Sequence, residues 1–87
     1  MLNQVFLIGR ICNLDTNRID LEWERDIEDL EPAVERVMCL MNDKMADNIA
    51  EFNLDLGDLV GIKGKYICHE GKGAIYIDKL TFLASNR

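Results

Sequence analysis

The chain has 87 residues, of which 48% are hydrophobic and 30% are charged, a composition typical of one folded globular domain. No apolar run approaches the roughly 20 residues of a membrane-spanning helix, and the start MLNQVF lacks the basic region of a secretion signal. The net charge of −6 argues against the basic surface with which proteins usually bind nucleic acid. We therefore expect a single domain over residues 1–87, in the cytoplasm and without membrane contact.

The first half of the chain is predicted to form three strands. Side chains alternate with a period of two over residues 3–14, which predicts the first strand. Turn-forming residues follow, and RIDLEWER at residues 18–25 alternates apolar and charged side chains, as a half-buried strand does. Residues 26–32 are expected to form an acidic loop, because Pro32 excludes a central strand there. Residues 34–41 form the third predicted strand.

A short helix is predicted next. Its buried stripe has spacings of four, three and four residues, which place the side chains on one helix face. Asn42 or Asp43 can cap its start and Gly57 can end it. The stripe consists of Met45, Ile49, Phe52 and Leu56.

Two further strands are predicted at residues 59–68 and 74–83, joined by the tight connection HEGKG. Gly61 and Gly64 mark places of strong coiling or close packing in the first of them. The order of three strands, a helix and two strands is that of an OB-fold. We therefore predict an all-β protein, a five-stranded Greek-key barrel with one helix between strands three and four.

The negative charge is concentrated in residues 20–35, which hold eight acids and one base, Arg25. The rest of the chain has 10 − 1 = 9 bases and 16 − 8 = 8 acids, a net charge of +1. Such a run is usually a solvated loop or face, and an acidic docking element is the alternative.

Residues that carry catalytic or metal chemistry are few. Cys12, Cys39 and Cys68 are widely separated and lie in apolar runs, which indicates free thiols rather than disulfides or a zinc site. His69 is the one histidine, and neither a phosphate-binding GxxxxGK[ST] nor a GxSxG motif is present. We expect no enzyme activity, no metal and no cofactor.

Four segments resemble the bacterial single-stranded DNA-binding protein family. The start MLNQVFLIGRI is similar to the opening strand of that family, and VMCLM before a helix resembles its third strand. GDLVGIKGK and IYIDKLTFL are similar to its fourth and closing strands. The resemblance covers almost the whole chain in the right order, and it implies a homo-oligomer, a dimer or tetramer, that binds single-stranded DNA, with RNA as an open alternative.

The resemblance, together with strand parity, also predicts where nucleic acid would bind. Asn3 and Arg10 match positions that touch the backbone, Arg36 can bind phosphate or stack on a base, and Trp23 lies near a base-stacking position. The remaining candidates belong to the last two strands and their connection. They are Lys65, His69, Lys72 and Tyr76.

The aromatic residues have a competing interpretation. Trp23 shares parity with Ile19 and Leu21, so a core position is as well supported as an exposed one. Tyr66 is predicted inside, whereas Tyr76 can be exposed. The remaining aromatic residues, Phe6, Phe52 and Phe82, are predicted to belong to the core.

The third strand supports a different class of function. Val34, Met38 and Leu40 are aliphatic where the family resemblance would place tryptophan and phenylalanine. An aliphatic face is typical of a protein interface. The alternative prediction is therefore an OB-fold interaction or oligomerisation module that has lost nucleic-acid binding.

Overall fold

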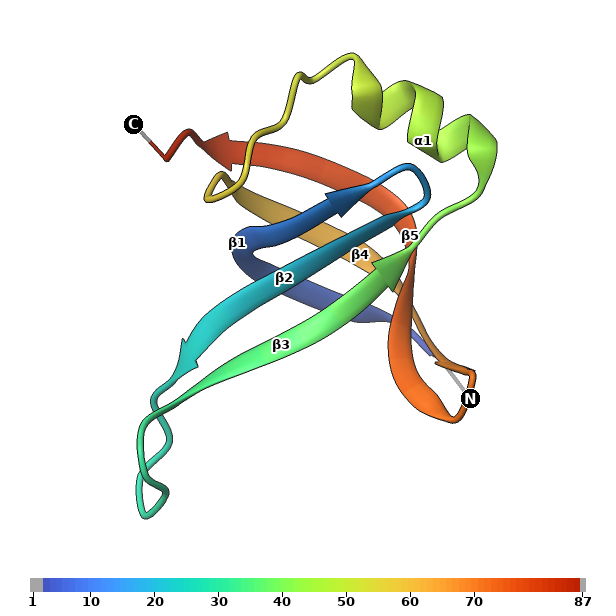
Figure 1. The fold of residues 1–87 in the computed structure, drawn as a ribbon. Coiled ribbons are helices and arrows are strands. Elements are labelled where there is room, and N and C mark those ends of the chain that lie inside the picture. Colours follow the sequence, from blue (N-terminus) through green and yellow to red (C-terminus); the bar gives the residue numbers. More distant parts are fainter. Residues whose placement is uncertain (1–2, 87) are drawn as a thin grey trace.

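The computed structural model describes residues 3–86, which form a closed five-stranded barrel with one helix (Figure 1). The strand order is β1-β2-β3-β5-β4, and β4 pairs back onto β1. Pairing is antiparallel except between β3 and β5, which are parallel. The predicted OB-fold is confirmed. The elements are β1 (Val5–Asp15), β2 (Arg18–Arg25), β3 (Ala33–Leu40), α1 (Asp43–Ala50), β4 (Leu59–His69) and β5 (Lys72–Ala84).

The core consists of the apolar side chains that alternate to the inside of each strand. Ile11 of β1, Ile19 and Leu21 of β2, and Cys39 of β3 are almost completely buried. The last two strands and the helix complete this core with a further set of aliphatic residues. They are Met41, Ile49, Val60, Ile62, Ile75, Ile77 and Leu80.

Strands β4 and β5 bend around the barrel at Gly64. The register of their pairing shifts between Lys63 and Gly64. A side chain at Gly64 would collide with the main-chain oxygen of Tyr76 and with Ile75. The predicted close packing at Gly64 is therefore observed, and only glycine fits between the two strands.

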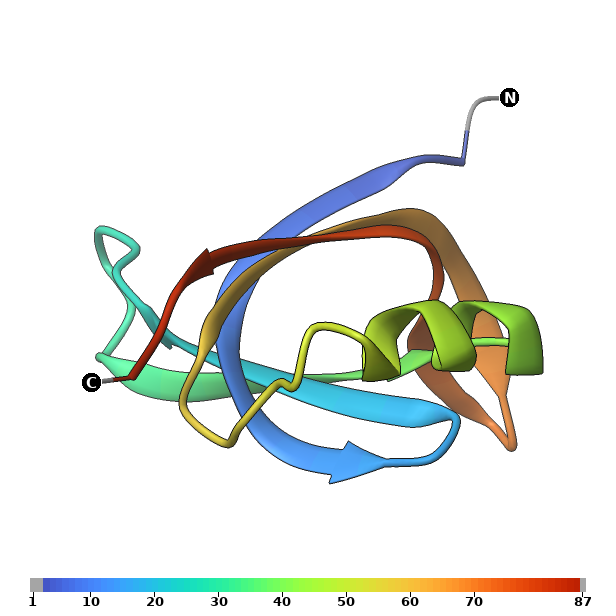
Figure 2. The same cartoon turned by 90° about the horizontal axis from the view of Figure 1, so that it is seen from above.

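Helix α1 covers one end of the barrel (Figures 1 and 2). The Asn42 side chain caps its start and accepts a 2.8 Å hydrogen bond from Met45 N. The predicted end at Gly57 is wrong, because the helix ends at Ala50 and the chain enters the left-handed region at Asn53, with φ 51°. Asparagine tolerates this conformation better than most residues. In residues 3–86, no helix is long and apolar enough to cross a bilayer.

The early helix end changes which side chains are buried. Phe52 and Leu56 were predicted to continue the buried stripe, but both are exposed. Leu54 instead packs against the core together with Met45. The helix therefore contributes about two turns of apolar contact, and an irregular segment provides the rest.

Asp58 joins the segment after α1 to β1 and to the residues that follow β5. It is buried, and its carboxylate accepts hydrogen bonds from Asp55 N at 2.9 Å and Asn86 N at 3.1 Å. Its main-chain oxygen accepts from Ile11 N at 2.9 Å, next to the bulge of β1. A buried carboxylate is stable only when it is hydrogen-bonded, and these partners supply that requirement.

Four predicted core positions of aromatic residues are wrong. Phe6, Phe52, Tyr66 and Phe82 are all exposed. Phe6 lies on the outer side of β1, and Tyr66 follows the inward parity of β4 but lies where this strand extends beyond the barrel wall. Parity thus identifies a side of a strand, whereas burial depends on what covers that side.

Candidate nucleic-acid interface

The outer face of β3 presents the residues that parity predicts. Val34 and Arg36 are exposed and Met38 is half-buried, whereas the intervening Cys39 points into the core. β3 pairs with β2 on one side and, over residues 38–40 only, with β5 on the other. Toward the start of β3, the two strands β3 and β5 therefore separate.

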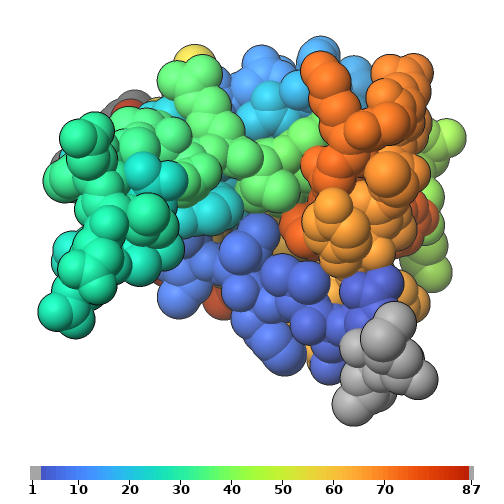
Figure 3. All heavy atoms as spheres, turned by 90° about the horizontal axis from the view of Figure 1, so that it is seen from below, coloured from blue at the N-terminus to red at the C-terminus, as the bar shows by residue number. Residues whose placement is uncertain are grey.

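A cleft of about 270 Å³ lies between β3 and the β4–β5 hairpin. It brings together Arg36 from β3 with His69 and Lys72 from the hairpin, three of the residues predicted from sequence. Viewed from below, the β2–β3 hairpin and the orange β4–β5 hairpin lie at opposite sides of one face (Figure 3). The lining residues are Arg18, Arg36, Val37, Met38, His69, Glu70, Lys72 and Gly73.

A tight turn positions the two residues that the hairpin contributes to the cleft. His69 pairs with Lys72 across the turn, and the two residues between them, Glu70 and Gly71, have φ angles of 52° and 79°. Two successive positive φ angles are typical of the two-residue turns that match the twist of a hairpin. The turn thus fixes His69 and Lys72 beside each other.

One row of side chains connects the cleft to the next part of the sheet. Arg18 lies opposite Leu40, Leu40 opposite Tyr76, and Tyr76 opposite Lys65. Directly opposed residues in a sheet point to the same side. Two further predicted residues, half-buried Tyr76 and exposed Lys65, therefore share the outer face with Arg18.

Carboxylates offset part of this positive charge. Arg18 binds Asp20 through two hydrogen bonds of 2.8 and 2.9 Å, and these bonds raise the pKa of its guanidinium. Arg36 lies 3.3 Å from Glu22, the residue directly opposite on β2. A phosphate that binds here must compete with both carboxylates.

Arg10 and Asn3 lie outside the cleft. Arg10 is opposite Glu22 on the β1–β2 side, and its Nη1 donates a 3.0 Å hydrogen bond to Gly57 O. The amide of Asn3 donates to Tyr66 O at 2.7 Å and accepts from Tyr66 N at 3.0 Å. Asn3 therefore stabilises the start of the chain against β4.

Trp23 is half-buried and is not part of the cleft. It packs beside Gly9, at whose position a Cβ would lie 3.5 Å from Trp23 Cε3. It also borders a shallow groove of about 400 Å³ with Ile8 and Val34. It lies five positions from Arg18 along β2, about 16 Å at the rise of an extended strand.

Tyr66 is an aromatic residue near the cleft that sequence parity assigned to the interior. It is 55% exposed, and a Cβ at Gly73 would meet its ring atom Cζ at 2.9 Å. Gly73 also lines the cleft and Tyr66 does not, so the ring of Tyr66 lies beside one lining residue, on the side of the hairpin opposite to His69 and Lys72. The glycine on the neighbouring strand, which leaves room for a ring, was the available sequence signal.

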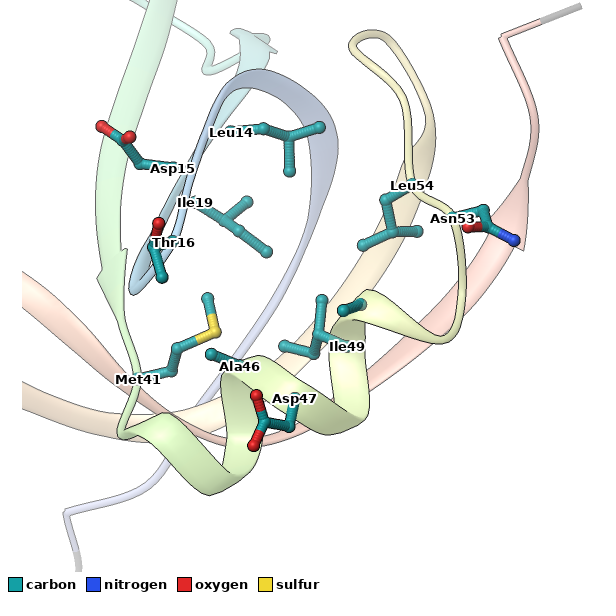
Figure 4. Close-up of a pocket in the computed structure, with 11 residues that line it drawn as sticks. Leu14, Asp15, Thr16, Ile19, Met41, Ala46, Asp47, Ile49, Asn53 and Leu54 are labelled. Atoms are coloured by element: carbon teal, nitrogen blue, oxygen red, sulfur yellow. The ribbon is translucent and has the colours of Figure 1, made fainter.

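A separate cleft of about 420 Å³ lies under α1 (Figure 4). Ile19, Met41 and Ile49 contribute apolar side chains to it, and Asp15 and Asp47 contribute carboxylates. None of the described residues that line it is basic. Its charge would repel phosphate, so this cleft does not suit a nucleic-acid backbone.

The three cysteines have different environments and are free thiols. Burial raises the pKa of the Cys39 thiol to about 12. Burial, followed by the charge of Glu22, raises the pKa of the Cys12 thiol, whose Sγ donates a 3.4 Å hydrogen bond to Asp20 O. Across residues 3–86, no three His, Cys, Asp or Glu side chains are grouped to hold a metal ion.

Comparison of the sequence with protein-family models gives no match. Comparison with curated proteins also gives none.

Solved structures with the same fold are numerous. A small single-stranded DNA-binding protein from Mycoplasma pneumoniae has a TM-score of 0.76 and 21% identity, and the match covers 93% of both chains. An SSB from Plasmodium falciparum, in complex with ssDNA, has a TM-score of 0.73 and 20% identity over 95% of this chain and 96% of that one. The protein PriB from Ralstonia solanacearum has a TM-score of 0.75 and 12% identity over 94% and 98%. At 12% to 21% identity, these three matches confirm the OB-fold that the sequence resemblance implies.

Proposed function

We propose that this protein binds single-stranded DNA and acts by binding rather than by catalysis. The proposal rests on one observation. Arg36, His69 and Lys72 line the same cleft, although they come from two separate parts of the chain. Single-strand binding combines cations along the phosphate track with aromatic rings on which bases stack. The exposed ring of Tyr66, which lies beside Gly73 of the cleft, supplies the second requirement.

The electrostatic contribution is expected to be modest. We propose that Arg10, Arg36, Lys65 and Lys72 neutralise phosphates, while the net charge of −6 opposes binding at longer range. About four phosphate contacts on a single strand predict a slope of log K against log salt near −3. Weak, strongly salt-sensitive binding with little preference for base sequence is therefore expected.

Stacking would supply the rest of the binding energy. Each base that stacks on an aromatic ring contributes roughly 1 to 3 kcal/mol. Tyr66 and Tyr76 are the rings closest to the cationic cleft, and Trp23 offers a partly exposed ring farther along β2. A strand on the outer face could reach Tyr76 directly, whereas Tyr66 and Trp23 follow the inward parity of β4 and β2, so the strand would have to turn past an edge of the sheet to stack on them.

The test is a titration with fluorescein-labelled oligothymidylate, followed by anisotropy at several salt concentrations. Arg36→Ala combined with Lys72→Ala should weaken binding at low salt and reduce the magnitude of the salt slope by about 1.4, because two phosphate contacts are lost. Lys44→Glu is the control with the same charge change, at an exposed position outside the cleft. A salt slope near zero in the native protein, or equal losses in the double variant and the control, would contradict the proposal.

Competition experiments define the ligand further. Unlabelled single-stranded DNA should compete, and duplex DNA should compete poorly, because stacking needs unpaired bases. RNA of the same sequence tests the open alternative. We also infer that the protein forms a homo-oligomer, since large apolar side chains on the outer sides of β1 and β5 are exposed. The cytoplasm remains the expected location.

A second candidate function is that of a protein-interaction module. The outer face of β3 favours it, because Val34 is exposed and Met38 and Leu40 beside it are only half-buried. Met38→Asp separates the two functions. Loss of an oligomer with unchanged nucleic-acid binding would favour the module, whereas loss of nucleic-acid binding alone would favour the cleft.

A further inference from the structure

The outer face of β1, β4 and β5 contains an apolar groove that nucleic-acid binding does not use. Phe6 is 70% exposed and Ile8 63% exposed, and the groove between these strands has a volume of about 440 Å³. Gly61 lies opposite Ile8 and has no side chain to fill the space. We name this surface the β1/β4/β5 groove, and its outward residues are Phe6, Ile8, Gly61, Lys63, Lys79 and Thr81.

Two lysines face each other within this apolar surface. Lys63 is directly opposite Lys79 on one side and Phe6 on the other, and its Nζ lies 5.8 Å from the centre of the Phe6 ring. Among residues 3–86, the ion pairs involve Arg18, Arg25 and Arg36 but neither of these lysines. Like charges directly opposite each other destabilise a sheet. An anionic group placed between the two lysines would relieve this repulsion.

The β2–β3 connection has the complementary pattern. Ile27 and Leu30 are 54% and 53% exposed, and Leu30 N donates a 3.2 Å hydrogen bond to Ile27 O across the turn. Asp29 has a φ of 69° in this turn, so the chain reverses tightly there. Four acids and no base surround the two apolar side chains in residues 26–31, which we name the acidic tip.

Arg25 holds the base of the acidic tip. Its guanidinium donates to Glu31 O at 3.2 and 2.6 Å, and its Nη1 binds Glu35 Oε1 at 2.9 Å. The tip projects away from the barrel (Figure 1). It is therefore placed to reach another molecule.

The two surfaces match in spacing and in charge. Phe6 and Ile8 are two residues apart on one strand, about 7 Å, and the ends of a tight turn are also separated by less than about 7 Å. The acidic tip thus presents two exposed aliphatic side chains with acids beside them. The groove presents two exposed apolar side chains and two lysines.

We propose that the acidic tip of one copy docks into the β1/β4/β5 groove of a second copy. Ile27 and Leu30 pack against Phe6 and Ile8, and the carboxylates of the tip bind Lys63 and Lys79. The contact joins two different surfaces, so it is heterologous and continues from copy to copy unless a ring closes. Symmetric pairing of two grooves would instead bring the lysines of both copies together.

The proposal does not depend on nucleic-acid binding, and it is tested on the protein alone. Sedimentation velocity over a concentration series at low salt should show association beyond a dimer, which weakens as salt is added. Lys79→Glu in the groove, or Glu28→Lys in the tip, should each weaken association about tenfold or more, because like charges then meet. An equimolar mixture of these two variants should associate again, because each tip then finds a groove of opposite charge.

Two exposed positions near α1 provide charge-matched controls. Lys44→Glu and Glu51→Lys change the net charge by the same amounts outside both surfaces and should leave association unchanged. All four substitutions are on the surface, and backbone amide spectra would verify the fold of each variant. The proposal is wrong if the native protein remains monomeric, if Lys79→Glu and Glu28→Lys associate like the native protein, or if their mixture does not recover.

Discussion

At the scale of single residues, the neighbours of a side chain decide what it can do. Tyr66 lies on the inward parity of β4, yet its ring is exposed, because it rests on Gly73, which lines the cationic cleft. Cys39, also inward by parity, is buried completely in the barrel. The first position can contribute to binding and the second to stability.

Tyr66→Leu should weaken oligothymidylate binding by about 1 to 3 kcal/mol, because the variant keeps an apolar side chain but loses the stacking ring. Phe52→Leu is the control, since Phe52 is an exposed aromatic residue after α1 and does not line the cleft. Anisotropy titrations of both variants measure the difference. Equal affinities for Tyr66→Leu and the native protein would remove Tyr66 from the binding site.

The buried thiol of Cys39 predicts a loss of stability at alkaline pH. Its pKa is raised by burial from 9.0 to about 12 in the folded protein. The protonated thiol contributes fully to the free energy of unfolding below pH 9. This contribution is lost as pH rises toward 12, because only the unfolded chain releases the proton between these pH values. Urea unfolding from pH 8 to 11 should show a smaller decline of the free energy of unfolding in Cys39→Ala, and an identical decline would argue against this contribution.

At the scale of elements, the β4–β5 hairpin determines how the barrel and the cleft are related. Gly64 lets β4 pass close to Tyr76 of β5, and the register shift beside it bends both strands. Beyond that bend, the hairpin extends past the wall and carries His69 and Lys72 to the side of β3. A substitution at Gly64 would therefore affect both the stability of the fold and the geometry of the cleft.

Gly64→Ala should lower the free energy of unfolding by about 1 to 3 kcal/mol, since the new methyl group must push the backbone of β5 away. Gly61→Ala on the same strand is the matched control, because its Cβ would find its nearest neighbour at 3.7 Å, an ordinary contact distance. Urea denaturation of both variants provides the measurement. Similar stabilities would show that β5 can relax at no cost.

At the scale of the whole molecule, the charge is divided between the two hairpins. The β2–β3 connection carries four acids in residues 26–31, whereas the β4–β5 hairpin contributes His69 and Lys72 to the cleft. The remainder outside residues 20–35 is close to neutral. The acidic segment thus sets the sign of the net charge and opposes the approach of a nucleic acid at low salt.

Neutralising the acidic tip should therefore strengthen binding of single-stranded DNA. The variant Asp26→Asn/Glu28→Gln/Asp29→Asn should bind a few-fold more tightly at low salt, and the difference should vanish near 1 M salt, where the Debye length is about 3 Å. Titrations at low protein concentration keep self-association out of the measurement. A difference that persists at high salt would indicate a direct contact rather than a long-range field.

Local sequence patterns are enough to specify the barrel. A period of two along each strand, turn residues between them and one short amphipathic segment specify the order of elements, and these signals are local. These local patterns placed Ile19 and Leu21 inside and Arg36 outside, as the structure has them. They failed where burial depends on a distant segment, as for Phe6 and Tyr66.

Which side chains meet depends on how the strands pair. Arg36, His69 and Lys72 share a cleft because β3 and β5 pair in parallel for three residues and then separate, while Trp23 remains at the far part of β2. Helix α1 likewise ends at Ala50 and not near Gly57, because Leu54 in the following segment packs against the core. Pairing register between strands is a non-local property, and the pattern along one strand does not contain it.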